Sequence, residues 1–182
     1  MRVCMAQVLA EPHLTRAWGM YTKAFAGMRA AAAQRHVMTE AEFWQVMRDD
    51  RVGKHLAISD DGGEVAALAT FTNELEAMPL ISPEFFAHRW PKLYAQRRIW
   101  YLGFFAIDAK HRSAGLFEDV IAQMWEPVMR EGGIATLDMC AQNVELGLGK
   151  AIERTLHGLT PEMTAECVDT QSYWAYCLGD ME

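Results

Sequence analysis

Apolar positions that recur every three or four residues mark buried helix faces in this chain. Thr39 and Glu42 fit a capping box, which predicts that one of these helices starts there. Ser82-Pro83-Glu84 offers a cap, a proline at the first helical position and an acid, and predicts a helix that ends before Pro91. The remaining predicted faces are Trp18, Tyr21, Phe25 and Met28; Leu116, Val120, Ile121, Met124, Val128 and Met129; and the stretch from Leu146 to Leu156. Pro127 is expected to kink its helix or to end its regular hydrogen bonding nearby, although the apolar period continues past it, and Gly132-Gly133 is expected to terminate the segment.

Aromatic and β-branched runs predict strands between these helices. The tight reversal Asp60-Asp61-Gly62-Gly63 joins two of them into an antiparallel hairpin. The predicted strands are Val3 to Leu9, His55 to Ser59, Val65 to Phe71, Ile99 to Ile107, Ile134 to Cys140 and, as one or two closing strands, Cys167-Val168 with Tyr173 to Leu178. The order β-α-α-β-β-α-β-α-β-α-β predicts an α/β or mixed α+β layered sheet with helices on its faces.

Composition fits one folded domain over residues 1–182, with 51% hydrophobic and 23% charged residues. No apolar run reaches the roughly 20 residues of a membrane span, and the N-terminus lacks a signal-peptide core, so a cytoplasmic protein without a membrane partner is expected. The four cysteines have no zinc or redox spacing, which favours buried free thiols and no metal. A net charge of −7 argues against a nucleic-acid partner.

The stretch from Leu102 to Phe117 reads LGFFAIDAKHRSAGLF. It resembles the strand-loop-helix signature of the GNAT acyltransferases, whose key pattern is Arg-x-x-Gly-x-Gly/Ala. Arg112 and Gly115 occupy the first two positions, and Phe117 stands where that family has Gly or Ala. A glycine in a tight loop lets backbone amides approach phosphate oxygens, and the helix that follows directs unpaired N–H groups at the same anion. Without the resemblance, the favoured interpretation of residues 109–114 is a polar turn between a core strand and a helix.

The resemblance implies a central mixed, mostly antiparallel sheet with a splayed strand pair and helices on both faces. It also implies an acyl-CoA cosubstrate, acetyl-CoA in the simplest case. Its pyrophosphate would lie on Arg112, Ser113, Ala114, Gly115, Leu116 and Phe117, and the main chain of Phe105 and Ile107 would bind the pantetheine arm. Asn143 is a further candidate contact, with a helix cap or a turn at the strand end as alternatives.

Candidates for proton transfer are less well marked. The tyrosine that this family often carries near the last helix is missing between Arg154 and Leu159, so no general acid is assigned. Asp138 is the candidate catalytic residue, because a carboxylate inside an apolar strand, if it is buried, needs a partner or a raised pKa. Glu74, Glu76 and Asp108 are less specific candidates, and Asp108 also suits a loop-fixing role.

The predicted function is direct transfer of an acyl group from acyl-CoA to the amine of a small molecule or peptide. The alternative is a catalytically inactive CoA-binding or protein-interaction module on the same fold. The segment from Pro79 to Arg98 is expected to wall the acceptor side of the cleft with its aromatic residues, or else to patch the sheet. The sequence does not specify the acceptor or the oligomeric state.

Overall fold

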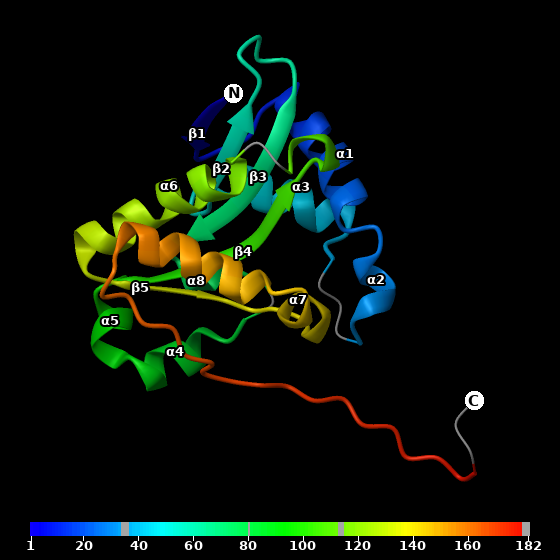
Figure 1. Ribbon diagram of the computed structural model, residues 1–182, viewed down its shortest axis with the longest axis vertical. Helices are drawn as coiled ribbons and strands as arrows, with labels where there is room; N and C mark the ends of the chain where they lie inside the picture. The colour runs from blue at the N-terminus through cyan, green and yellow to red at the C-terminus, as the bar shows by residue number, and fades with distance from the viewer. Residues whose placement is uncertain (34–36, 80, 113–114, 180–182) are drawn as a thin grey trace.

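The computed structural model describes residues 1–182 apart from 34–36, 80, 113–114 and 180–182 (Figure 1). Its centre is a five-stranded sheet in the order β1-β2-β3-β4-β5. Neighbours are antiparallel from β1 to β4, whereas β4 and β5 are parallel. The strands are β1 (Arg2–Ala6), β2 (Gly53–Ile58), β3 (Val65–Thr72), β4 (Ile99–Ile107) and β5 (Ile134–Leu137).

Helices connect the strands and cover both faces of the sheet (Figure 1). Before β2 come α1 (His13–Ala24), α2 (Met28–Ala31) and α3 (Glu40–Arg48); between β3 and β4 come η1 (Leu75–Ala77), α4 (Pro83–Arg89) and α5 (Pro91–Ala95); after β4 come η2 (Ala109–His111), α6 (Leu116–Glu131), α7 (Ala141–Glu145) and α8 (Leu148–Leu159). The predicted capping box is confirmed, because the Glu42 N–H donates to Thr39 Oγ1 and the Thr39 N–H donates to the Glu42 carboxylate. The predicted hairpin is confirmed as β2 and β3.

A β-bulge at Gly103 changes which face of the sheet the β4 side chains occupy. Thr70 pairs with Phe104 and Phe71 pairs with Leu102, so Gly103 is an extra residue in β4. Before the bulge, Trp100 and Leu102 pack on the α6 face; after it, Phe105 and Ile107 do so, and Phe104 packs with α1 and α3. The bulge therefore reverses which face of the sheet the odd- and even-numbered side chains of β4 occupy. A β-bulge also increases the local twist of its strand.

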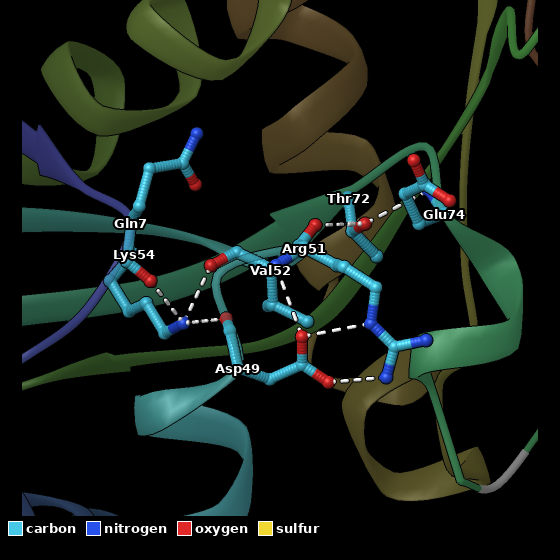
Figure 2. Close-up of polar contacts among 7 residues, drawn as sticks. All are labelled: Gln7, Asp49, Arg51, Val52, Lys54, Thr72 and Glu74. Atoms are coloured by element: carbon cyan, nitrogen blue, oxygen red, sulfur yellow. Dashed lines mark hydrogen bonds and ion pairs between the residues drawn. The ribbon is translucent and has the colours of Figure 1, made fainter.

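Lys54 joins three segments near the start of β2. Its side chain is fully buried, and Nζ donates to the carbonyl oxygens of Gln7 at 2.7 Å, Asp49 at 2.5 Å and Val52 at 2.6 Å (Figure 2). Arg51 pairs with Asp49 next to it, and this hydrogen-bonded ion pair lowers the pKa of the Asp49 carboxyl. The Lys54 ammonium therefore supplies hydrogen-bond donors to main-chain carbonyls in the segments after β1 and after α3, outside the hydrogen-bonded ladder of the sheet.

Of two predictions for the second half of the chain, one is confirmed and one is wrong. Helix α6 continues past Pro127 to Glu131 and ends, as predicted, at Gly132, which adopts a left-handed conformation at φ +62°. The closing strands are absent from residues 164–179, which run in extended form away from the body of the molecule (Figure 1). Alternating apolar residues indicate a strand, but a strand forms only where a neighbouring strand supplies hydrogen bonds.

All four cysteines are free, but Cys167 and Cys177 are exposed rather than buried, because both lie in the extended segment. Within the described ranges, no helix is long and apolar enough to cross a membrane.

Candidate functional site

The two parallel strands β4 and β5 part half-way along β4. Their ladder begins at Ile99 and Ile134 and ends where Leu102 pairs with Leu137. β4 continues to Ile107 with β3 on one side, and among the described residues no strand pairs with its other edge beyond Leu102. Main-chain groups on that edge need partners from elsewhere, and an extended ligand can supply them.

The loop after β4 is held by its own aspartate. Asp108 Oδ1 accepts a hydrogen bond from the Lys110 N–H at 2.9 Å, and the Asp108 N–H donates to Ala66 O at 2.9 Å. His111 lies 3.4 Å from Glu64 of the β2–β3 turn. Asp108 therefore has the loop-fixing role that the sequence allowed for it, at the entrance to α6.

Gly115 is the residue before α6 and has φ +71°, a left-handed conformation that side chains disfavour. Among the described residues, a Cβ atom at Gly115 would meet nothing within 4 Å, so the space at this one position is open. Open space at Gly115, a 16-residue helix and its unpaired N–H groups are the features on which anion binding at a helix N-terminus depends. Glu118 and Asp119 in that first turn are exposed and weaken its positive field.

Of the other residues predicted to bind the pyrophosphate, some lie in the exposed loop and others pack in the core. Arg112 is exposed, whereas Leu116 is buried on the α6 side of the sheet. The Phe117 ring packs edge-on against Phe105 with 5.2 Å between ring centroids, so it faces β4. Ser113 and Ala114, which the sequence also assigned to the loop, lie outside the described residues.

Asp138 follows β5 directly and is exposed, so the prediction of a carboxylate inside a strand is wrong. The apolar run extends further along the chain than the ladder does, because β5 ends at Leu137 where β4 diverges. Asp138 nevertheless accepts a short hydrogen bond from the Tyr101 hydroxyl. Tyr101 is 4% exposed, and burial, with the Asp138 carboxylate beside it, raises the pKa of this phenol far above its usual value.

Sequence reasoning missed Tyr101 as a polar group of the site. An aromatic residue in a central strand is usually interpreted as part of the hydrophobic core. The Tyr101 ring does pack in the core, edge-on against Phe86 with 6.3 Å between ring centroids. The available signal was the need of a buried tyrosine hydroxyl for a partner.

Asn143 lies in the first turn of α7 and is half-buried. Cys140 is the residue before α7 and Gly147 the residue before α8, so Asn143 caps neither helix and does not end β5. The two structural alternatives considered for Asn143 are therefore wrong.

Glu74 and Glu76 lie near the start of β4, at the end of that strand opposite to the loop after Ile107. Glu74 forms an ion pair with Arg97, and Glu76 accepts a hydrogen bond from Tyr94 that lowers the pKa of its carboxyl. These side chains line a cavity of about 460 Å³ beside Ile99. Among the described residues, no group of three or more His, Cys, Asp and Glu side chains could hold a metal ion.

No protein-family model matches the sequence, and no curated protein matches it. Solved structures do match the arrangement of the elements. A point mutant of the BH1408 protein from Bacillus halodurans has a TM-score of 0.58 at 10% identity, over 97% of this chain and 100% of that chain. An N-acetyltransferase from Staphylococcus aureus Mu50 has a TM-score of 0.57 at 14% identity, over 86% of this chain and 83% of that chain.

A third matching structure was solved with a bound CoA-containing ligand, as its name states. AAC(6')-Iy, in complex with the bisubstrate analogue CoA-S-monomethyl-acetylneamine, has a TM-score of 0.53 at 13% identity, over 96% of this chain and 100% of that chain. The chain has the GNAT fold. The predicted mixed, mostly antiparallel sheet is thereby confirmed, with helices on both faces. At sequence identities of 10 to 14%, these structural matches show the fold of this chain and do not show its activity.

Proposed function

We propose that residues 1–182 form a single acyl-CoA-dependent N-acyltransferase domain that transfers the acyl group, acetyl in the simplest case, directly to an amine. The observation that carries this proposal is the unpaired edge of β4 beyond Leu102, which leads to an open, glycine-bounded helix start. An extended arm that ends in a phosphate group fits both features. The GNAT fold supports the choice of CoA for that ligand, and AAC(6')-Iy was solved with a CoA-containing analogue.

In this proposal the pyrophosphate binds at the first turn of α6, where the open space over Gly115 admits it and Arg112 adds a charge contact. The remaining loop and helix-start residues assigned to it are Ser113, Ala114, Leu116 and Phe117. The main chain of Phe105 and Ile107 holds the pantetheine arm on the free edge of β4, while their side chains stay in the α6 core. Asn143 contacts the arm from the segment after β5.

Asp138 is the proposed proton acceptor for the incoming ammonium group. It is exposed and lies at the point where β4 and β5 part. The neutral amine attacks the thioester carbonyl, the C–N bond forms and the C–S bond breaks. The ammonium loses one proton to Asp138 before attack, and the second proton leaves with the CoA thiol. Backbone N–H groups of β4 stabilise the oxyanion.

Tyr101 is the proposed positioning residue of this pair. Its hydroxyl donates to Asp138, and its raised pKa keeps the phenol protonated at neutral pH, so that it orients the carboxylate and does not act as a base. No general acid is assigned.

The experiment is release of free thiol from acetyl-CoA in the presence of a panel of small amines and N-terminal peptides, with CoA binding measured by calorimetry. We expect amine-dependent thiol release. Asp138→Asn should lower kcat by about ten- to a thousandfold and leave CoA affinity unchanged. Tyr101→Phe should lower kcat less and shift the pH profile. No CoA binding at millimolar concentration would overturn the proposal.

Gly115→Glu tests the cofactor site itself, because it places a side chain and a negative charge in the proposed pyrophosphate site. We expect CoA binding to be lost while circular dichroism shows a folded chain. Gly62→Glu is the matched control: Gly62 also has a positive φ of +70° and no atom within 4 Å of its Cβ position, but it lies in the β2–β3 turn. CoA affinity that is equal in the two variants would contradict the site.

The second candidate function is a CoA-responsive or protein-binding module without catalysis. It is favoured by Phe117, whose ring packs on Phe105 at a position where the GNAT pattern has Gly or Ala. Such a module would be stabilised by CoA but would release no thiol with any amine, which separates it from the enzyme in the same experiment.

A further inference from the structure

The last described part of the chain exposes large apolar side chains that the fold does not cover. Residues 164–179 contain no helix or strand, and the exposed fractions of Trp174 and Tyr176 are 79% and 92%. Glu166 forms an ion pair with Arg89 of α4 at 3.3 Å, and beyond it the segment leaves the body of the molecule (Figure 1). Between Tyr173 and Leu178 the sequence has the aromatic and apolar composition of a strand.

The sheet offers an open edge to such a strand. β5 is the last strand in the sheet order and pairs only with β4, so within the described residues its outer edge has no strand neighbour. An unpaired edge presents a row of N–H and C=O groups that favours pairing with a further strand. The main-chain N–H and C=O groups of the segment can thus pair with those of the β5 edge.

We propose that residues 172–178 of one copy of this chain pair with the outer edge of β5 in a second copy, and that the exchange is reciprocal. The direction of the segment favours the second copy. The Arg89–Glu166 ion pair holds it against α4, and from there it runs outward, so pairing with its own β5 requires a reversal. A twofold-symmetric pair supplies each free segment with one edge and each edge with one segment.

The area is of the right size for a stable dimer. Tyr173, Trp174 and Tyr176 are each more than half exposed, and Leu178 is fully exposed. An aromatic side chain buries about 150–250 Å². Three from each copy would remove on the order of 1,000 Å² from water, before the main chain is counted, and specific interfaces bury roughly 1,200–2,000 Å². Added strands also gain main-chain hydrogen bonds, which fix the pairing.

The first test is light scattering of the full chain after gel filtration at 5 to 100 μM, roughly the range that separates tight from weak dimers. We expect the mass of two chains for the wild type and of one chain for the double variant Trp174→Ser, Tyr176→Ser. Val8→Ser is the matched control, since Val8 is an exposed apolar residue elsewhere (49%), and it should remain a dimer. A monomeric wild type, or a dimer that persists in the double variant, overturns the proposal.

The second test identifies which edge the segment occupies. An Ala135→Cys variant places a thiol on β5, where Ala135 is exposed, and Cys177 lies in the segment. Chains labelled with light and heavy nitrogen are mixed, incubated at low concentration, concentrated and treated with a short bismaleimide. Cross-linked peptides that combine the two labels are expected. Peptides of a single label only would show that the segment folds back on its own sheet, and would overturn the proposal.

Discussion

Lys54 shows how strongly one side chain can tie together separate segments. Replacement by methionine keeps most of the buried volume but removes the Nζ–H donors from the carbonyls of Gln7, Asp49 and Val52, of which Asp49 retains the Val52 N–H. Buried acceptors without partners are costly, so we expect Lys54→Met to lower the free energy of unfolding by about 2–4 kcal/mol in urea denaturation. Lys23→Met, at an exposed position of α1, should change it by less than about 0.5 kcal/mol. Equal effects would mean that the three bonds add nothing to stability.

The same residue predicts a pH dependence. Burial lowers the pKa of Lys54 to about 8, against the opposing influence of Asp49 and Asp50. A lysine of the unfolded chain titrates near 10.4, so between about pH 8 and 10 the unfolded chain holds a proton that the folded chain has lost. Stability from this group therefore rises with pH through that window. The stability difference between wild type and Lys54→Met should grow by roughly 1–3 kcal/mol from pH 7.5 to 10. A constant difference would contradict the lowered pKa.

At the residue scale, the sequence predicts which segments carry the candidate functional residues but not the contacts that these residues make. The pattern around Arg112 and Gly115 located the loop, and the structure adds the positive φ of Gly115, which only a backbone conformation can show. The apolar pattern predicts that Asp138 lies inside a strand, whereas it is an exposed residue after β5, beside a buried tyrosine. The hydrogen bond joins residues 37 positions apart, and no local pattern encodes that contact.

At the scale of a single element, the bulge in β4 depends on the absence of a side chain at Gly103. A Cβ atom there would lie 2.7 Å from Thr70 Oγ1 and would also clash with Met78. We expect Gly103→Ala to destabilise the chain by about 1–3 kcal/mol, because the β3 backbone holds Thr70 in place. Gly19→Ala is the control: Gly19 lies in α1 with nothing within 4 Å, and the change should stabilise that helix by up to about 1 kcal/mol. Thermal unfolding of both variants provides the measurement. A Gly103→Ala variant as stable as wild type would show that Thr70 and Met78 can move aside.

The inserted helices α4 and α5 provide the next prediction. Phe86 is buried and meets the Tyr101 ring, whereas Phe85 beside it is 37% exposed. Phe86→Ala should cost about 3–5 kcal/mol and, if the segment walls the acceptor site, should change the order of preferred amines more than the affinity for CoA. Phe85→Ala is the control for stability, and Trp90→Ala tests the second ring of the same cluster. Loss of stability with an unchanged amine preference would assign the segment to the sheet alone.

Most elements could be predicted from local patterns, and the two failures among the strands share one cause. β4 has the predicted bounds Ile99–Ile107, and the capping box places the start of α3. Both depend on nearby residues. The length of β5 and the state of residues 173–178 depend on where a partner strand lies, and hydrophobic alternation does not contain that information.

At the scale of the whole molecule, the described contacts separate the body from the extended segment. Within the described residues, the Arg89–Glu166 ion pair is the last salt bridge along the chain, and the side chains from Asp169 to Gly179 are all exposed. Every residue proposed to bind CoA, and both members of the Tyr101–Asp138 pair, lie before α8. The body should therefore fold and bind CoA without the segment.

A chain that ends after Val168 tests this separation directly. We expect it to be folded by circular dichroism and to bind CoA within about twofold of the full chain, since the proposed site loses no residue. Its melting temperature should be independent of protein concentration, whereas that of the full chain should rise with concentration, because a dimer is stabilised by mass action. The measurement is a thermal scan at 2 and at 100 μM, with calorimetry for CoA. Loss of CoA binding in a folded truncated chain would mean that the segment helps to build the cofactor site. An equal concentration dependence in the two chains would mean that the copies associate through the body and not through residues 172–178.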